Sequence, residues 1–156
     1  ELMQKHNLSE AILEEKLPLK GSVLAPAKAL CDTCKRKDSK PEKTSISEIK
    51  RVHEVIMDPE KCFLDQGVIC LGPATRSGCG ERCINANMPC RGCFGPPPQV
   101  SDQGAKMLSC LASLFATSDE EEIKKLTKSI ADPLGTFYRY SLASSLLRRK
   151  VMKGKK

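Results

Sequence analysis

The chain has 156 residues, enough for one domain with a modest core and too few for a large catalytic fold. It carries nine cysteines but only 4% aromatic residues and no tryptophan, so something besides large apolar side chains must hold it together, and no apolar run reaches the roughly 20 residues of a membrane span. Its net charge of +7 raises the question of nucleic-acid binding, but the basic runs at 35–43 and 148–156 lack aromatic residues that could stack on bases, which argues against a nucleic-acid partner.

The first 30 residues are expected to form a connecting segment with one short helix. Its apolar residues lie around a possible helix cap at Ser9, and they are Leu8, Ala11, Ile12 and Leu17. The opening residues lack the apolar stretch of a secretory signal, and an odd number of cysteines argues against complete disulfide pairing. We therefore expect a soluble protein of a reducing compartment, the cytoplasm, with no membrane partner.

A second helix is predicted over 45–57. Ser45 and Glu48 form a capping-box pattern, and an Asp-Pro pair follows that would end the helix. The apolar residues between them recur at helical spacing, and they are Ile49, Val52, Val55 and Ile56.

The cysteine-rich region, 31–98, differs from both of its flanks. From residue 62 onward it has no sustained helical or strand periodicity, only Gly, Pro and Cys, and a loop of this length is uncommon in a compact domain unless something inorganic organises it. The basic run at 35–43 is interpreted as a solvated loop. No hairpin signature or internal repeat is present, so we expect essentially no strand.

Three helices are predicted in the C-terminal region, 99–156. Ser101 can cap the first, which carries an apolar stripe. Ser118 and Glu121 form a capping box for the second, which stops at an Asp-Pro pair, and a third is expected from about Thr136 into the basic run. The expected fold class is mostly α with extensive irregular loops around a metal-binding middle.

Eight of the nine cysteines are grouped by their spacing. Two C-x-x-C pairs, which begin at Cys31 and Cys90, allow two thiolates to reach one metal centre, and a C-x-x-x-C pair begins at Cys79. Sequential grouping gives two sites of four thiolates: Cys31, Cys34, Cys62 and Cys70 form the first group, and Cys79, Cys83, Cys90 and Cys93 form the second. Cys110 stands alone and is expected to be an inert thiol beside the core.

The identity of the metal is left open by spacing alone, because zinc and iron-sulfur clusters both accept four cysteine thiolates. The distance in sequence between the first C-x-x-C and Cys62 or Cys70 favours a bulky cluster over a single ion. The glycines of these loops let backbone N–H groups approach the sulfurs. Arg76, Arg82 and Arg91 either compensate the negative charge of a cluster or are ordinary solvated residues.

The longest motif, at 70–96, has the sequence CLGPATRSGCGERCINANMPCRGCFGP. It closely resembles the small, or gamma, subunit of the methyl-viologen-reducing, deazaflavin-independent nickel-iron hydrogenases of methanogens and related anaerobes. Four shorter pieces resemble the same subunit: ALCDTCKR at 29–36, DPEKC at 58–62, DQGAKM at 102–107 and DPLGTFYR at 132–139. The resemblance extends from about residue 20 to the end of the chain.

This resemblance implies an iron-sulfur domain, the C-terminal domain of that small subunit, with two 4Fe-4S clusters and no catalytic centre. In the family, electrons from H2 oxidation pass along a proximal, a medial and a distal cluster. The first cysteine group matches the distal cluster, with Cys31 where many other nickel-iron hydrogenases have histidine. The second group matches the medial cluster, and Cys83 favours four irons there over the three found in some relatives.

The family's N-terminal flavodoxin-like domain, which holds the proximal cluster, has no counterpart in these 156 residues. The resemblance therefore implies that the chain is the C-terminal part of a longer subunit, or that this domain is a separate polypeptide. The implied partners are a large subunit with a nickel-iron centre and a 2Fe-2S acceptor subunit linked to heterodisulfide reductase.

Three other functions remain open on the sequence. A zinc-stabilised nucleic-acid-binding module would use the eight grouped cysteines and the positive charge. A disulfide-braced secreted scaffold would use the cysteines alone. The third is a closer relative, the small subunit of a sulfhydrogenase or of a bidirectional hydrogenase.

Overall fold

The computed structural model describes residues 8–20 and 22–149. Within these ranges the regular structure is helical and no strand is present, although isolated β-bridges join Ala29 to Arg76, Ile46 to Phe115 and Lys50 to Val68. The expected combination of helices and loops without strands is confirmed for this part of the chain. The outer ends of regions 1–30 and 99–156, with most of the C-terminal basic run, lie outside the described residues.

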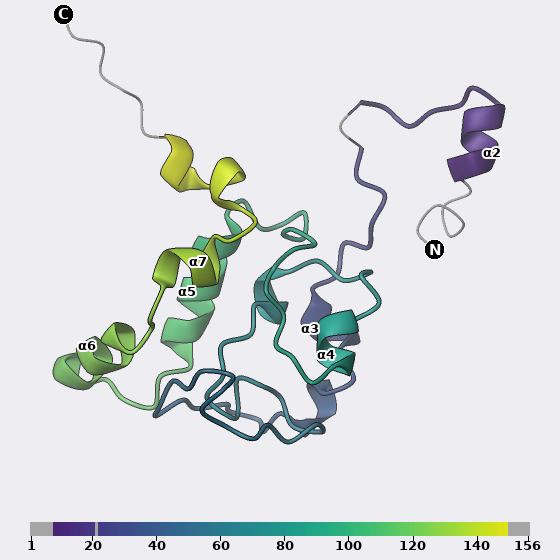
Figure 1. The fold of residues 1–156 in the computed structure, drawn as a ribbon. Coiled ribbons are helices and arrows are strands. Elements are labelled where there is room, and N and C mark those ends of the chain that lie inside the picture. Colours follow the sequence, from purple (N-terminus) through teal and green to yellow (C-terminus); the bar gives the residue numbers. More distant parts are fainter. Residues whose placement is uncertain (1–7, 21, 150–156) are drawn as a thin grey trace, which may run out of the picture.

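The α-helices of the described part are α2 (Leu8–Leu13), α3 (Leu30–Thr33), α4 (Arg82–Asn85), α5 (Gln103–Ser113), α6 (Glu120–Lys128) and α7 (Pro133–Phe137). Short 3-10 helices lie at Lys37–Ser39, Gly72–Ala74, Leu142–Ser144 and Leu146–Arg149. Figure 1 shows α5 and α7 side by side, with α3, α4 and the cysteine-rich loops on the other side of α5. The molecule therefore has a helical half and a loop half that meet at α5.

The N-terminal segment carries the short helix predicted around Ser9. This helix is α2, and it lies apart from the other helices (Figure 1). Ser9, the expected cap, lies inside the helix instead of at its start. The chain joins the loop half next to α3, where the Lys28 carbonyl accepts a hydrogen bond from the Ser77 amide at 2.9 Å and the Leu30 amide donates to the Thr75 carbonyl at 2.7 Å. These two bonds fix the start of α3, which carries the first of the grouped cysteines.

The helix predicted over 45–57 is wrong, because this segment is irregular and extended. Two of its amides bond to distant partners: the Ile46 amide donates to the Leu114 carbonyl at 2.6 Å, and the Lys50 amide donates to the Gly67 carbonyl at 2.9 Å. Within the segment a single turn closes, from the Glu54 amide to the Arg51 carbonyl at 3.0 Å. Its periodic apolar residues are β-branched, and such residues favour extended backbone as readily as helix. Ile56, one member of the predicted stripe, is fully exposed.

The first two C-terminal helices are confirmed, with each cap one residue later than predicted. Asp102 caps α5 through the Ala105 amide at 2.8 Å, and Asp119 caps α6 through the Glu122 amide at 3.0 Å. An aspartate lies directly after each predicted serine cap, and a carboxylate is at least as good an acceptor for these amides.

The last predicted helix, from about Thr136 into the basic run, is wrong in its start and its length. Asp132 accepts the Gly135 amide at 2.9 Å and Pro133 occupies the first turn, so α7 begins at the proline that was expected to end the preceding helix. After Phe137 the chain makes two 3-10 turns, in which the Ser144 and Ser145 hydroxyls donate to backbone carbonyls. Such local bonds compete with a continuing helix.

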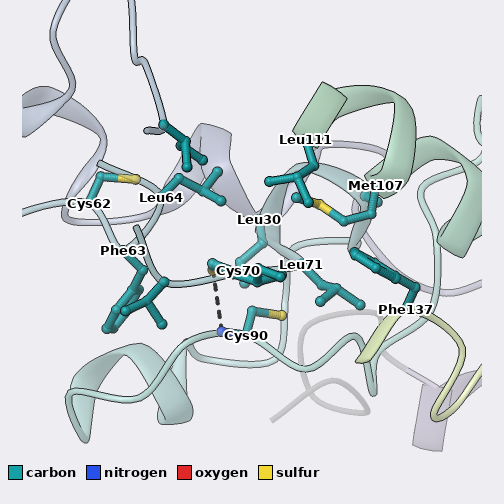
Figure 2. Close-up of a cluster of buried hydrophobic side chains, with 14 of the residues drawn as sticks. Leu30, Cys62, Phe63, Leu64, Cys70, Leu71, Cys90, Met107, Leu111 and Phe137 are labelled. Atoms are coloured by element: carbon teal, nitrogen blue, oxygen red, sulfur yellow. Dashed lines mark hydrogen bonds between the residues drawn. The ribbon is translucent and has the colours of Figure 1, made fainter. Parts of the chain in front are cut away.

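The core lies between α5 and the cysteine-rich loops. Figure 2 shows side chains from both halves meeting there, each no more than 2% exposed: Leu30, Leu71, Met107, Leu111 and Phe137. Cys62, Cys70 and Cys90 belong to the same buried cluster. The cysteine loops therefore share one core with α5 and α7, and the helices supply a wall against which the loops are ordered.

Candidate metal centres

The first cysteine group lines a single cavity. Cys31 lies on α3, Cys34 directly follows that helix, and the other two members, Cys62 and Cys70, come from the irregular loop and are buried. The space between them is about 20 Å³. That space holds roughly one water molecule, so a four-iron cluster requires the sulfurs to move apart, which loops without regular structure allow.

A buried arginine forms part of the wall of this cavity. The Arg36 guanidinium is 2% exposed and stacks 4.0 Å from the centre of the Phe63 ring. It donates to the carbonyls of Asp58 at 3.1 Å and Lys61 at 2.9 Å, and to the Asn87 side chain at 2.7 Å. Its Nε is buried without a partner, and no carboxylate pairs with it in the described part of the chain.

A lysine stands on the same wall. The Lys40 ammonium donates a hydrogen bond to the Cys31 sulfur and lies close to Cys62 and Cys34. Burial alone would lower the pKa of Lys40, but the negative charge that the neighbouring sulfurs carry once deprotonated outweighs burial and raises that pKa above its ordinary value. Like Arg36, Lys40 has no carboxylate partner among the described residues, so two cations without carboxylate partners line this cavity.

Burial makes several of the thiols weak acids. It raises the pKa of Cys31 to about 12, although the nearby Lys40 works in the opposite direction, and it also raises the pKa values of Cys70 and Cys90. These groups are therefore neutral thiols near pH 7 when nothing is bound to them. A metal that binds here has to displace their protons, and its own positive charge supplies the driving force.

Backbone amides point at the sulfurs. The Cys90 amide donates to the Cys70 sulfur at 3.3 Å (Figure 2), and the Gly92 amide donates to the Cys90 sulfur at 3.4 Å. Gly72 allows the closest approach, because a Cβ atom there would lie 3.0 Å from the Cys31 sulfur and 3.6 Å from the Cys70 sulfur. Amide donors of this kind stabilise sulfur that carries negative charge, as it does when bound to iron.

The second cysteine group is only partly drawn together. Cys90 is buried, and its electrostatic interactions place Cys79 and Cys93 near it. Cys83 lies exposed on α4, and within the described residues no hydrogen bond joins its side chain to the other three. The structure thus brings three of the four predicted ligands into one neighbourhood and leaves the fourth on an adjacent helix of a single turn.

The two groups are direct neighbours. Besides the bond from the Cys90 amide to the Cys70 sulfur, the Leu71 amide donates to the Cys90 carbonyl at 3.0 Å. The Cys70 and Cys90 side chains also interact electrostatically. Cofactors held by the two groups would therefore lie next to each other.

The cations expected from sequence are not the ones found at the first group. Arg76 is buried but donates to the Pro96 carbonyl at 3.0 and 3.1 Å, Arg82 is exposed, and Arg91 lines a separate surface pocket. The interpretation of the basic run at 35–43 as a solvated loop is wrong for two of its members, Arg36 and Lys40. Their position shortly after Cys34 was the only signal available in the sequence.

Cys110 lies outside both groups. It is half-buried on α5 and packs against the core, so its expected position beside the core is confirmed. Burial raises its pKa, and Lys106 and Lys40 act in the opposite direction.

Two further features of residues 8–20 and 22–149 concern metal ions and membranes. No set of three or more His, Cys, Asp or Glu side chains is close enough together there to hold one metal ion. A four-iron cluster spreads its thiolates further apart than a single ion does. No helix in these ranges is long and apolar enough to cross a bilayer.

No protein-family model matches the chain, but its curated relatives all carry the same kind of name. The chain is 43% identical over 129 residues to the G subunit of the F420-non-reducing hydrogenase of Methanothermus fervidus, and the match covers 80% of this chain and 100% of that protein. It is 40% identical over 146 residues to the iron-sulfur G subunit of the F420-non-reducing hydrogenase of Archaeoglobus profundus, a match that covers 92% of this chain and 45% of the relative.

A third relative has the same description. The G subunit of the F420-non-reducing hydrogenase of Methanothermobacter marburgensis is 39% identical over 139 residues, which cover 86% of this chain and 45% of that protein. The chain therefore spans less than half the length of the Archaeoglobus and Methanothermobacter relatives, and the whole length of the Methanothermus one.

Proposed function

Because the chain belongs to the family of the F420-non-reducing hydrogenase G subunits, we propose that it is the electron-transfer part of such a hydrogenase. The first cysteine group would hold a distal 4Fe-4S cluster and the second a medial one. Electrons from H2 oxidation on a large nickel-iron subunit would pass through both to a 2Fe-2S acceptor subunit linked to heterodisulfide reductase. The cytoplasm is the expected compartment, and the Archaeoglobus relative, named an iron-sulfur subunit, supports the cofactor.

The observation that carries the proposal is the pair of cations without carboxylates at the first group. A buried guanidinium such as that of Arg36 is costly unless an anion compensates it. Four thiolates around four irons carry a net negative charge, whereas a set of neutral thiols carries none. The residues therefore fit a cluster better than they fit an empty thiol cavity.

The chain's own residues would position and insulate the cofactors. When bound, each cluster takes up and releases single electrons. Phe63, Leu64 and Ile84 line the first cavity with Leu30 and exclude water from it. The Cys90 amide would hold the Cys70 sulfur in place, and the Gly92 amide would hold the Cys90 sulfur. Because the first of these hydrogen bonds joins the two cysteine groups, it would also keep the two clusters adjacent. No proton transfer or substrate pocket on this chain is needed for that task.

Iron content in matched cysteine variants tests the proposal. The chain, produced and purified without oxygen, should contain about eight irons and as much acid-labile sulfide, four of each for each cluster. Cys34→Ala should lose about half of the iron, because a cluster at the first group loses a ligand. Cys110→Ala is the control, since it removes a thiol that lies outside both groups, and its iron content should not change.

Two results would contradict the proposal. Colourless protein that contains zinc instead of iron would favour the zinc-stabilised module. Equal iron loss in Cys34→Ala and Cys110→Ala would mean that the ligands are grouped wrongly.

A further inference from the structure

We propose that Lys40 sets the reduction potential of the cluster at the first cysteine group, by holding its ammonium against the Cys31 sulfur inside the cavity wall. This inference rests on the proposed function, because it requires a cluster at that group. It assigns a positioning role to a residue of the basic run, not a ligand role.

The geometry singles out Lys40 among the cations of its run. Its side chain lines the cavity together with all four cysteines of the first group, it donates to the Cys31 sulfur, and no carboxylate neutralises it in the described chain. Lys37 and Lys43 belong to the same run but are exposed. A charge held beside a partly buried site acts through a lower effective dielectric than an exposed one.

The electrostatic consequence has a definite sign. Reduction adds one electron to the cluster and moves no proton, so the reduced cluster is one charge more negative than the oxidised one. A fixed ammonium next to a ligating sulfur stabilises the more negative state more strongly. Lys40 therefore raises the reduction potential of the first cluster.

No lysine or arginine of the described residues acts on Cys90, the buried member of the second group, as Lys40 acts on Cys31. At its buried sulfur, that of Cys90, the donor is the neutral Gly92 amide at 3.4 Å. Neutralising Lys40 should therefore shift one of the two clusters and leave the other in place. This selectivity separates a local electrostatic role from general damage to the fold.

Arg36 lines the same cavity but is less suited to such a role or to its test. Its guanidinium is held by two carbonyls, an amide and an aromatic ring, so its removal disturbs packing as well as charge. Lys40 is only half-buried and its contacts are with sulfur. It can be replaced with less disturbance of the core.

The test is a redox titration of the anaerobically purified holoprotein that carries this chain, followed by EPR. Lys40→Met keeps the length of the side chain and removes the charge, Lys40→Arg keeps the charge, and Lys37→Met is the matched control. We expect the midpoint of one cluster to fall in Lys40→Met, the other to stay, and both midpoints in Lys40→Arg and Lys37→Met to remain near those of the unchanged protein.

The outcomes distinguish this inference from the proposed function. Full iron content with both midpoints unchanged in Lys40→Met would overturn the role of Lys40 and leave the two clusters intact. Loss of iron in Lys40→Met and Lys40→Arg alike would also overturn it, because Lys40 would then be needed for assembly. Absence of iron from the unchanged protein would instead overturn the proposed function.

Discussion

The two halves of the molecule are ordered by different means. In the helical half, α5 and α6 each start at an aspartate that accepts an amide three residues later, so the interactions that fix each helix start are local in sequence. In the loop half, one side chain makes three long-range hydrogen bonds. Arg36, which lies two residues after the first C-x-x-C pair, donates to residues that are 22, 25 and 51 positions further along the chain. The loop half therefore depends on long-range contacts that converge around the cysteines, whereas each helix start is specified by residues nearby in sequence.

Removal of the metal should have the largest effect, and it should lower amide protection far more in the loop half than in the helical half. Without bound iron the loop half would lose the group that holds the four sulfurs of each cysteine group together, so chelation after oxidation should abolish amide protection across 62–98. Protection in α5 should fall but persist, because its cap and its contacts with α7 remain. Hydrogen exchange read by mass spectrometry measures both regions in one experiment, and equal loss in both would contradict the distinction.

Replacement of the buried Arg36 should have the next largest effect, which is on the free energy of unfolding. Arg36→Met keeps most of the apolar stem but removes the donor to the carbonyls of Asp58 and Lys61 and the charge in the wall of the first cavity. We expect the free energy of unfolding of the holoprotein to fall by on the order of 3 kcal/mol. Anaerobic denaturant titration measures it.

Arg51→Met is the control for that variant, since Arg51 is exposed and its side chain makes no hydrogen bond or ion pair in the described part of the chain. Its replacement should change stability by no more than about 0.5 kcal/mol. Equal stability of the two variants would show that the Arg36 guanidinium has no anionic partner.

The two aspartates that cap α5 and α6 differ in burial and in the number of hydrogen bonds that they accept, so their replacement should have unequal effects on stability. Asp102 is buried and accepts from the amides of Ala105 and Leu146, both at 2.8 Å, and from the Tyr138 hydroxyl. Its burial would raise its pKa, but these donors outweigh burial and hold the pKa below the ordinary value of 3.8. Asp119 is exposed and accepts at its helix start from the Glu122 amide.

Asp102→Ala should therefore cost about 2–3 kcal/mol of stability, and Asp119→Ala about 1 kcal/mol. The difference arises because Asp102 also ties the 3-10 turn at Leu146 to the start of α5. Thermal or denaturant unfolding followed by circular dichroism measures both. Equal losses would mean that Asp102 acts only as a local cap.

The sequence predicted what local chemistry determines. The short helix around Ser9 and the helices α5 and α6 lie within one or two residues of where local pattern predicted them, and the cysteine spacing selected the four residues that line the first cavity. The helix over 45–57 failed because its backbone pairs with Leu114 and Gly67, which no local pattern indicates.

Arg36 and Lys40 were missed for the same physical reason. A basic run looks solvated in sequence, and only the fold shows that Asp58, Lys61 and Asn87 surround one of its members and that Cys31 contacts another. The last helix failed because a proline that can stop one helix also fits the first turn of the next. Residues whose environment is built from distant segments are thus the ones that sequence reasoning cannot place.

The most direct test of the account is the EPR spectrum of the fully reduced, anaerobically purified protein. The groups that would hold the two clusters are joined by the bond between the Cys90 amide and the Cys70 sulfur, so two reduced clusters should interact magnetically and give a broadened, coupled signal. In partly reduced protein, where most molecules carry one electron, the signal should be that of a single uncoupled cluster. A fully reduced protein with no iron-sulfur signal, or with one isolated cluster, would contradict the claim that two adjacent cysteine groups carry electrons.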